Sequence, residues 1–159
     1  MVGVMNYNNI NMTEYYKECL EKGLKYQDFI TEILLIELGI CLSSYASKKY
    51  QQCKGENIQG FEIKFDDKFK ETGNIYIEVK EKSNSNNENY VKSGIYRNDN
   101  TWLYLIGNYN TLYIFSKSHL KLMHEKKKYE EKIIPTSKGF IIPEIDCDKY
   151  CIKKINIKN

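Results

Sequence analysis

The sequence lacks an apolar run long enough to cross a membrane. A spanning helix needs about 18 consecutive apolar residues, and no stretch of the 159 residues reaches that length. Residues 1–11 also lack the charged start and apolar segment of a secretory signal. We therefore expect a cytoplasmic protein that has no membrane partner.

Paired cysteine motifs are absent as well. The five cysteines are odd in number, and no two of them form a C-x-x-C pair. A disulfide framework and a zinc site are therefore not expected, and reduced thiols are the default in a cytoplasm. No repeat is present that would indicate a coiled coil or a solenoid.

Arginine is almost absent. The 24 basic residues include one arginine, Arg97, and the rest are lysines. The planar guanidinium group binds phosphate or carboxylate in a way that lysine cannot, so Arg97 is a candidate anion contact. The net charge of +3 is compatible with a nucleic-acid partner but does not require one.

What is present is sufficient for one folded domain. Hydrophobic residues make up 42% of the chain and aromatic residues 13%, which is enough for a core. We expect a single domain over residues 1–159, with a core at about 27–128 and accessory elements at 129–159. The small size, and a composition rich in residues with A/T-rich codons, suggest a phage or mobile-element gene.

Helical periodicity dominates the first third of the chain. We expect a short helix at 14–20 that ends near Gly23, and a long helix at 27–50. Apolar residues recur in the second segment at spacings of three and four, and additional leucines make it apolar nearly all round. This pattern predicts a buried central helix.

Alternating residues predict strands in the middle of the chain. Residues 61–66 and 74–82 both alternate between apolar and polar, and the polar connector 67–73 is expected to close them into a hairpin. A polar loop at 83–89 precedes a second hairpin at 101–106 and 111–115, and a basic helix should follow to about residue 128. The order predicts a mixed α/β (α+β) fold whose sheet is built from hairpins around a buried N-terminal helix, with flanking helices.

The polar faces of the first predicted hairpin carry the strongest chemical signal. Period two places Glu62, Lys64 and Asp66 on one side of the first strand, and Glu78 and Lys80 on one side of the second. Pairing of the strands would gather three carboxylates beside ammonium groups, and a hard oxygen-ligand set suits Mg²⁺. The alternative is an ordinary solvated face with cross-strand ion pairs.

The spacing of these residues resembles a known signature. Asp66 followed twelve residues later by Glu78-Val79-Lys80 is similar to the motif of the PD-(D/E)xK nuclease superfamily. The resemblance implies a restriction-endonuclease-like fold and a catalytic Mg²⁺ or Mn²⁺ ion. It implies that Asp66, Glu78 and the main-chain carbonyl of Val79 hold the metal, and that Lys80 positions the attacking water.

Two further groups of residues complete the expected site. Glu62 or Glu37 would serve as an accessory catalytic acid, with Glu32 as the other helix carboxylate that could join the site. The residues expected to contact nucleic-acid phosphates are Lys64, Lys82, Lys92, Ser93, Tyr96 and Arg97.

These observations lead to two alternative functions. The first is a metal-dependent DNA endonuclease that hydrolyses phosphodiester bonds, either as a homodimer or by nicking structured or partner-presented DNA. The second is a catalytically inactive module of the same fold that binds DNA or a host protein, for example an inhibitor of host defence. In the second case the acidic residues would be ordinary surface charges.

Overall fold

The computed structural model describes residues 14–158, so the segment in which no secretory signal is expected lies outside the described residues. Its helices are α1 (Glu14–Leu38), α2 (Lys48–Lys54), α3 (Phe69–Thr72), the short 3-10 helix η1 (Gly94–Tyr96), α4 (Lys117–Glu125) and α5 (Glu144–Tyr150). Its strands are β1 (Phe61–Phe65), β2 (Asn74–Glu81), β3 (Val91–Lys92), β4 (Leu103–Gly107), β5 (Thr111–Ser116), β6 (Glu131–Ile134), β7 (Ser137–Pro143) and β8 (Lys153–Asn156). The mixed α/β class is as predicted.

The strands form two sheets of four. The first has the order β1-β4-β5-β8, in which β1 runs parallel to β4 and the other pairs are antiparallel. The second has the order β3-β2-β7-β6 and is antiparallel throughout. β7 lies in the segment expected to be accessory, yet it is an inner strand of the second sheet.

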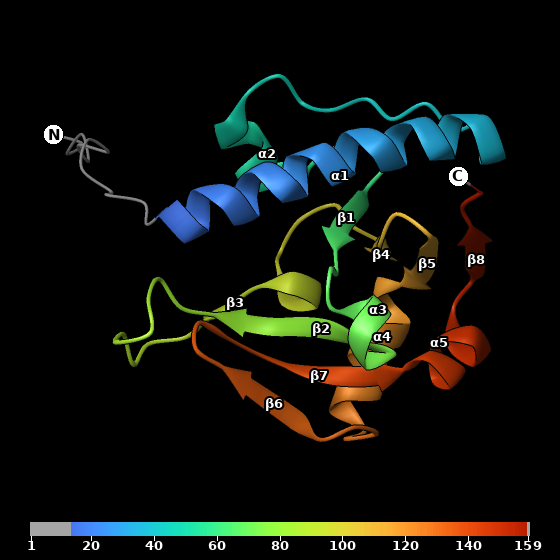
Figure 1. Ribbon diagram of the computed structural model, residues 1–159. Helices are drawn as coiled ribbons and strands as arrows, with labels where there is room; N and C mark the ends of the chain where they lie inside the picture. Colours follow the sequence, from blue (N-terminus) through green and yellow to red (C-terminus); the bar gives the residue numbers. More distant parts are fainter. Residues whose placement is uncertain (1–13, 159) are drawn as a thin grey trace, which may run out of the picture.

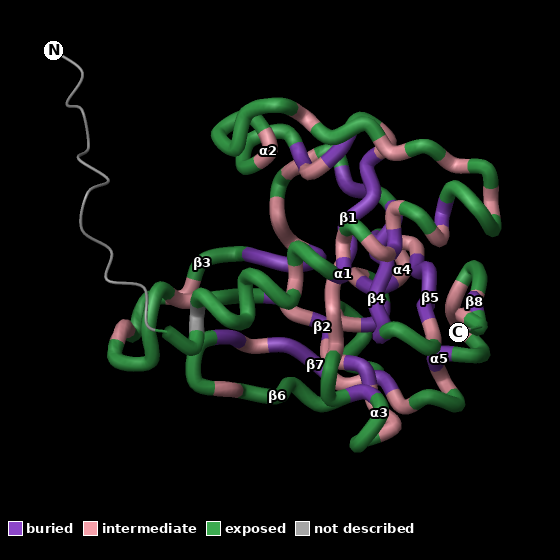
Figure 2. Tube along the Cα trace, turned by 45° about the horizontal axis from the view of Figure 1, so that its top comes forward, coloured by how far each residue is buried: buried purple, intermediate pink, exposed green. Residues whose placement is uncertain are grey.

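The two sheets and α1 make layers, with α1 across the outer face of the first sheet (Figure 1). Tyr26, Ile30 and Leu34 recur every four residues along α1 and pack on Phe61 and Ile63 of β1. A second core fills the space between the sheets, and Figure 2 shows that burial is concentrated in β4 and β5. Because side chains alternate along a strand, Glu62 and Lys64 face away from α1, toward the second sheet.

The long helix differs from the prediction in position and in burial. A single helix runs through Gly23 and ends at Leu38, where Gly39 takes a left-handed conformation with φ 65°. Leu35 and Ile36 are exposed on it, so α1 is a surface helix and the expectation of a buried central helix is wrong. Only one stripe of the helix finds a partner, because the sheet offers a single face to it. Within the described residues, no helix is long and apolar enough to span a membrane.

The first predicted hairpin is also wrong in its pairing. β1 and β2 have the expected positions in the sequence, with α3 between them along the chain, but they belong to different sheets. β1 pairs instead with β4, with Glu62 opposite Tyr104 and Lys64 opposite Ile106. The second predicted hairpin is confirmed as β4 and β5. Alternation predicted both strands correctly, but it contains no information about which strand each one pairs with.

The docking of α1 can be tested with a matched pair of neighbouring leucines. Leu34 is fully buried against the first sheet, whereas Leu35 is 53% exposed. We expect Leu34→Ala to lower the free energy of unfolding by about 2–5 kcal/mol, because it leaves a cavity, and Leu35→Ala to lower it by less than about 1 kcal/mol. Urea unfolding followed by circular dichroism measures both. Equal effects would show that α1 does not pack as described.

Candidate active site

A cavity of about 630 Å³ opens where the end of β1 meets the second sheet. Lys64 and Asp66 reach it from the first sheet, Tyr104 reaches it from β4, and Tyr76 and Glu78 line it from β2. Lys132 closes it on the side of β6. The cavity therefore joins the polar residues of two strands that do not pair with each other.

Glu62 does not line the cavity itself, but it pairs with Lys64, which does. Glu62 is only 1% exposed, and Lys64 Nζ lies 3.0 Å from its Oε1 atom. Apart from this ion pair, neither carboxylate oxygen has a hydrogen-bond donor among the described residues, although both are buried. A buried carboxylate normally satisfies its oxygens with several donors, so Glu62 has unused capacity to bind a cation or a proton donor.

Lys64 remains charged in this setting. Burial by itself opposes its charged form, but the nearby Glu62, Tyr104 and Glu56 favour it, and the pKa of Lys64 is raised above its ordinary value. The side chain is 38% exposed and lines the cavity. The site thus holds a fixed ammonium group beside a buried carboxylate.

Glu78 faces the same cavity from β2 and is held in place by Ser93. The Ser93 hydroxyl donates a hydrogen bond of 2.6 Å to Glu78 Oε1. Gly94 has φ 49°, and a Cβ atom there would lie 2.1 Å from the Glu78 carbonyl oxygen, so only glycine allows this close approach. Burial raises the pKa of Glu78 above its ordinary value, and the Ser93 hydrogen bond and the Lys64 charge oppose the rise.

Asp66 lines the cavity, but its carboxylate is occupied by the backbone. Its Oδ1 accepts hydrogen bonds from the N–H groups of Lys68 and Phe69, and its Oδ2 accepts one from Tyr76 N–H. Burial raises the pKa of Asp66, while these three N–H groups act in the opposite direction. Asp66 therefore organises the turn that carries the chain from β1 through α3 to β2.

The structure places Glu78 and Lys80 on opposite faces of the second sheet. Glu78 is opposite Gly139, whereas Lys80 is opposite Lys138, with an irregularity at Val79 between them. Opposite residues share a face, and the consecutive residues 138 and 139 of β7 do not. A β-bulge at Val79 thus breaks the alternation, and the expectation of a shared polar face is wrong. Lys80 is exposed and does not line the cavity.

The other predicted ligands are distant from the cavity or already have partners. The Val79 carbonyl accepts a hydrogen bond from Ser93 N–H. Glu37 and Glu32 are exposed on α1, which covers the opposite face of the first sheet from Glu62. These two helix carboxylates are therefore not brought together with Glu62 and Glu78.

The predicted phosphate contacts divide into two groups. Arg97 pairs with Asp99 and donates to the carbonyls of Gln51 and Gln52, so its guanidinium group fastens α2 to the rest of the fold. The Tyr96 hydroxyl bonds to His124, and Ser93 is buried against Glu78. Lys64 lies in the cavity, whereas Lys82 and Lys92 lie at the far end of the second sheet.

Two residues near the cavity were missed by the sequence analysis. Glu56, in the segment before β1, is half-buried, and burial raises its pKa despite the nearby Lys64 charge. Tyr104 is buried beside Glu62, Lys64 and Glu78, and its pKa is also raised by burial. No local pattern marks Glu56. The pairing of β1 with β4 is what brings Tyr104 to Glu62.

The donor set fits a divalent cation that is completed by other ligands. Among residues 14–158, no three His, Cys, Asp or Glu side chains are arranged to hold a metal ion. Mg²⁺ commonly uses one or two carboxylates and keeps waters and substrate phosphates as its other ligands. Glu78 lines the cavity, and Lys64, which also lines it, pairs with the buried Glu62, so Glu62 and Glu78 offer at most two carboxylates here.

Comparison of the chain with family models, with curated proteins and with solved structures gives no match. The assignment of a function therefore depends on the residues of the cavity and on the chemistry that they allow.

The raised pKa of Glu78 predicts a pH-dependent effect on stability. Its ordinary value is 4.5, and burial favours the protonated form in the folded chain. Stability is therefore lost as the pH rises through the folded-state pKa. We expect Glu78→Gln to raise the free energy of unfolding at about pH 7, and the difference from wild type to vanish below about pH 4.5.

Denaturant unfolding with a chelator present, repeated across the pH range, measures this difference. Glu88→Gln, at an exposed position of the loop 83–89, is the matched control and should not show the trend. A Glu78→Gln variant that is less stable than wild type at neutral pH would contradict the prediction.

Proposed function

We propose that this chain is a metal-dependent nuclease that hydrolyses phosphodiester bonds in DNA, with Glu62, Lys64 and Glu78 at the centre of its active site. The observation that carries the proposal is the buried Glu62 carboxylate, whose only hydrogen-bond donor among the described residues is the Lys64 ammonium group. Its only charged partner there, Lys64, opens onto the cavity.

Asp99 shows that this chain can satisfy a buried acid elsewhere. Its carboxylate is also 1% exposed, but it pairs with Lys117 and Arg97 and accepts a hydrogen bond from Thr101 N–H. An unsatisfied buried carboxylate destabilises a fold. The contrast between Asp99 and Glu62 supports a functional role for Glu62, because Lys64 is its only compensating partner among the described residues.

Each residue has a role in this proposal. Glu62 and Glu78 would hold the cation, which when bound would polarise the scissile phosphate and favour the ionised form of a water molecule. Lys64 stays protonated and places positive charge beside the site where negative charge develops on the phosphate. Ser93 fixes the orientation of the Glu78 carboxylate through its hydrogen bond.

The cavity has a suitable charge pattern for a phosphate chain. Besides Lys64, it is lined by Lys68 and Lys132, so three lysines line it together with the carboxylates of Asp66, Asp67 and Glu78. Amide and hydroxyl groups of Asn74, Thr72 and Tyr76 offer further hydrogen bonds. Phosphate contacts of this kind position a nucleic acid without reading its sequence.

The acid-x-Lys pair of this site lies on β1 and not on β2, where the sequence pattern predicted it. Glu62-Ile63-Lys64 has the same pattern as Glu78-Val79-Lys80, and its two polar residues share a face of β1. Glu78 then supplies the acid from the neighbouring strand. The resemblance to the PD-(D/E)xK superfamily supports this reading in residue types, while the order of acid and acid-x-Lys along the chain is reversed.

Cleavage assays with single substitutions test the proposal. We expect the wild-type chain to cut DNA in Mg²⁺ or Mn²⁺, and Glu62→Gln, Glu78→Gln and Lys64→Met each to lower the rate by at least about 100-fold, because each removes a charged group at the reacting phosphate. Supercoiled plasmid, duplex and single-stranded oligonucleotides are incubated with each variant and resolved on gels.

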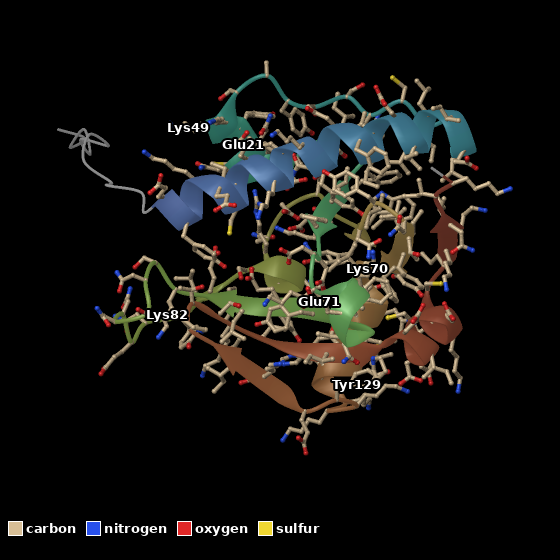
Figure 3. The ribbon with its side chains drawn as sticks, in the orientation of Figure 1. Glu21, Lys49, Lys70, Glu71, Lys82 and Tyr129 are labelled. Carbon is tan, nitrogen blue, oxygen red and sulfur yellow. The ribbon has the colours of Figure 1, made fainter. Side chains whose placement is uncertain are left out.

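Matched controls are available on α3, which lies close to the cavity. Glu71→Gln and Lys70→Met change the same residue types at exposed positions, labelled in Figure 3, and should retain wild-type cleavage. Binding of DNA without cleavage in any divalent cation would contradict the enzyme and support the non-catalytic module. Loss of cleavage in Lys80→Met but not in Lys64→Met would return the catalytic role to Lys80.

A further inference from the structure

Three lysines stand in one row across the second sheet. Lys92 of β3 is directly opposite Lys80 of β2, and Lys80 is directly opposite Lys138 of β7. Opposite residues share a face and have Cβ atoms about 5 Å apart. Three ammonium groups therefore lie side by side on three neighbouring strands.

A fourth lysine joins the row through an aromatic ring. Lys82 Nζ lies 5.1 Å and Lys138 Nζ 4.5 Å from the centre of the Tyr90 ring. Lys82, labelled in Figure 3, follows the last residue of β2, where the chain enters the polar loop 83–89. Tyr90 thus holds two of the ammonium groups together by cation–π attraction. We call Lys80, Lys82, Lys92 and Lys138 the lysine surface.

This arrangement is electrostatically unfavourable in the free protein. Like charges directly opposite each other on paired strands destabilise a sheet. Within residues 14–158, none of the four lysines makes an ion pair, whereas lysines elsewhere, such as Lys22 and Lys117, do. Glu81, the nearest acid along β2, is opposite Ser137 and so faces the cavity side of the sheet. Among the described residues, two of these four ammonium groups contact the Tyr90 ring and one of them the Ser85 carbonyl oxygen, but none of the four pairs with a carboxylate.

We propose that the lysine surface binds the phosphate backbone of the nucleic acid on which the cavity acts. This inference rests on the proposed function and extends it. The lysine surface begins at Lys80, which lies two residues and about 7 Å along β2 from Glu78, on the opposite face of the sheet. Ammonium groups are point charges that suit phosphates without reading bases. The bulge at Val79 turns Lys80 out of the cavity and into this row.

Salt-dependent binding is the test. A fluorescein-labelled DNA duplex is titrated with protein in EDTA, so that no cleavage occurs, over a series of NaCl concentrations. We expect the triple variant Lys80→Gln, Lys92→Gln, Lys138→Gln to bind more weakly. Its slope of log K against log [NaCl] should be smaller by about 0.9 for each phosphate that the variant no longer neutralises.

A matched triple variant controls for net charge. Lys48, Lys49 and Lys54 are exposed on α2, which lies near the top of the molecule in Figure 1, away from the second sheet. Their replacement by glutamine should leave the slope unchanged. Equal losses in both triple variants, or no loss in the first, would overturn the proposal. Weaker binding to phosphatidylserine vesicles with unchanged DNA binding would overturn it as well.

Two further measurements distinguish a failure of this binding proposal from a failure of the proposed nuclease activity. Glu62→Gln should abolish cleavage while keeping the wild-type salt slope, because it leaves the lysine surface intact. If the wild-type chain never cleaves DNA but the first triple variant still loses binding, the enzyme proposal fails and the lysine surface stands. Removal of like charges should leave the free energy of unfolding equal or higher, so a large loss of stability would contradict the described register.

Discussion

The period-two geometry of β1 is the constraint on which the site depends. One face of the strand, Phe61 and Ile63, packs on α1 and closes the outer core. The same alternation sends Glu62 and Lys64 toward the second sheet, where solvent is scarce. Burial of a carboxylate there destabilises the fold, and it is the ammonium of Lys64 that makes it tolerable. The raised pKa of Lys64 and the proposed chemistry follow from this placement.

The bulge at Val79 places an acidic residue on one face of the second sheet and a basic residue on the other. Ser93 and Gly94 press against β2 at Glu78, and the strand bulges at the next residue. On one face Glu78 enters the cavity, and on the other Lys80 joins a row of lysines. The short segment 91–96 therefore orients an acid and helps to assemble a basic surface.

Local patterns predicted strands and some residue types well, and they failed where pairing decided the outcome. Alternation located β1, β2, β4 and β5, and it marked Glu62 and Glu78 as polar positions on strands. It could not show that β1 pairs with β4, because register depends on contacts between distant segments. Arg97 was predicted to contact phosphate because it is the only arginine. In the folded chain its guanidinium group instead pairs with Asp99 and donates to two carbonyl oxygens of α2, which are distant in the sequence.

The sequence by itself determined the mixed α/β class, the positions of the central strands and the set of acids and lysines from which a site could be built. These are consequences of side-chain periodicity, which acts over a few residues. Only the tertiary structure decided that Glu62 is buried, that Lys64 rather than Lys80 opens onto the cavity, and that Asp66 serves the turn. Those outcomes depend on which strands meet, and a single bulge at Val79 is enough to send two neighbouring polar side chains to opposite faces.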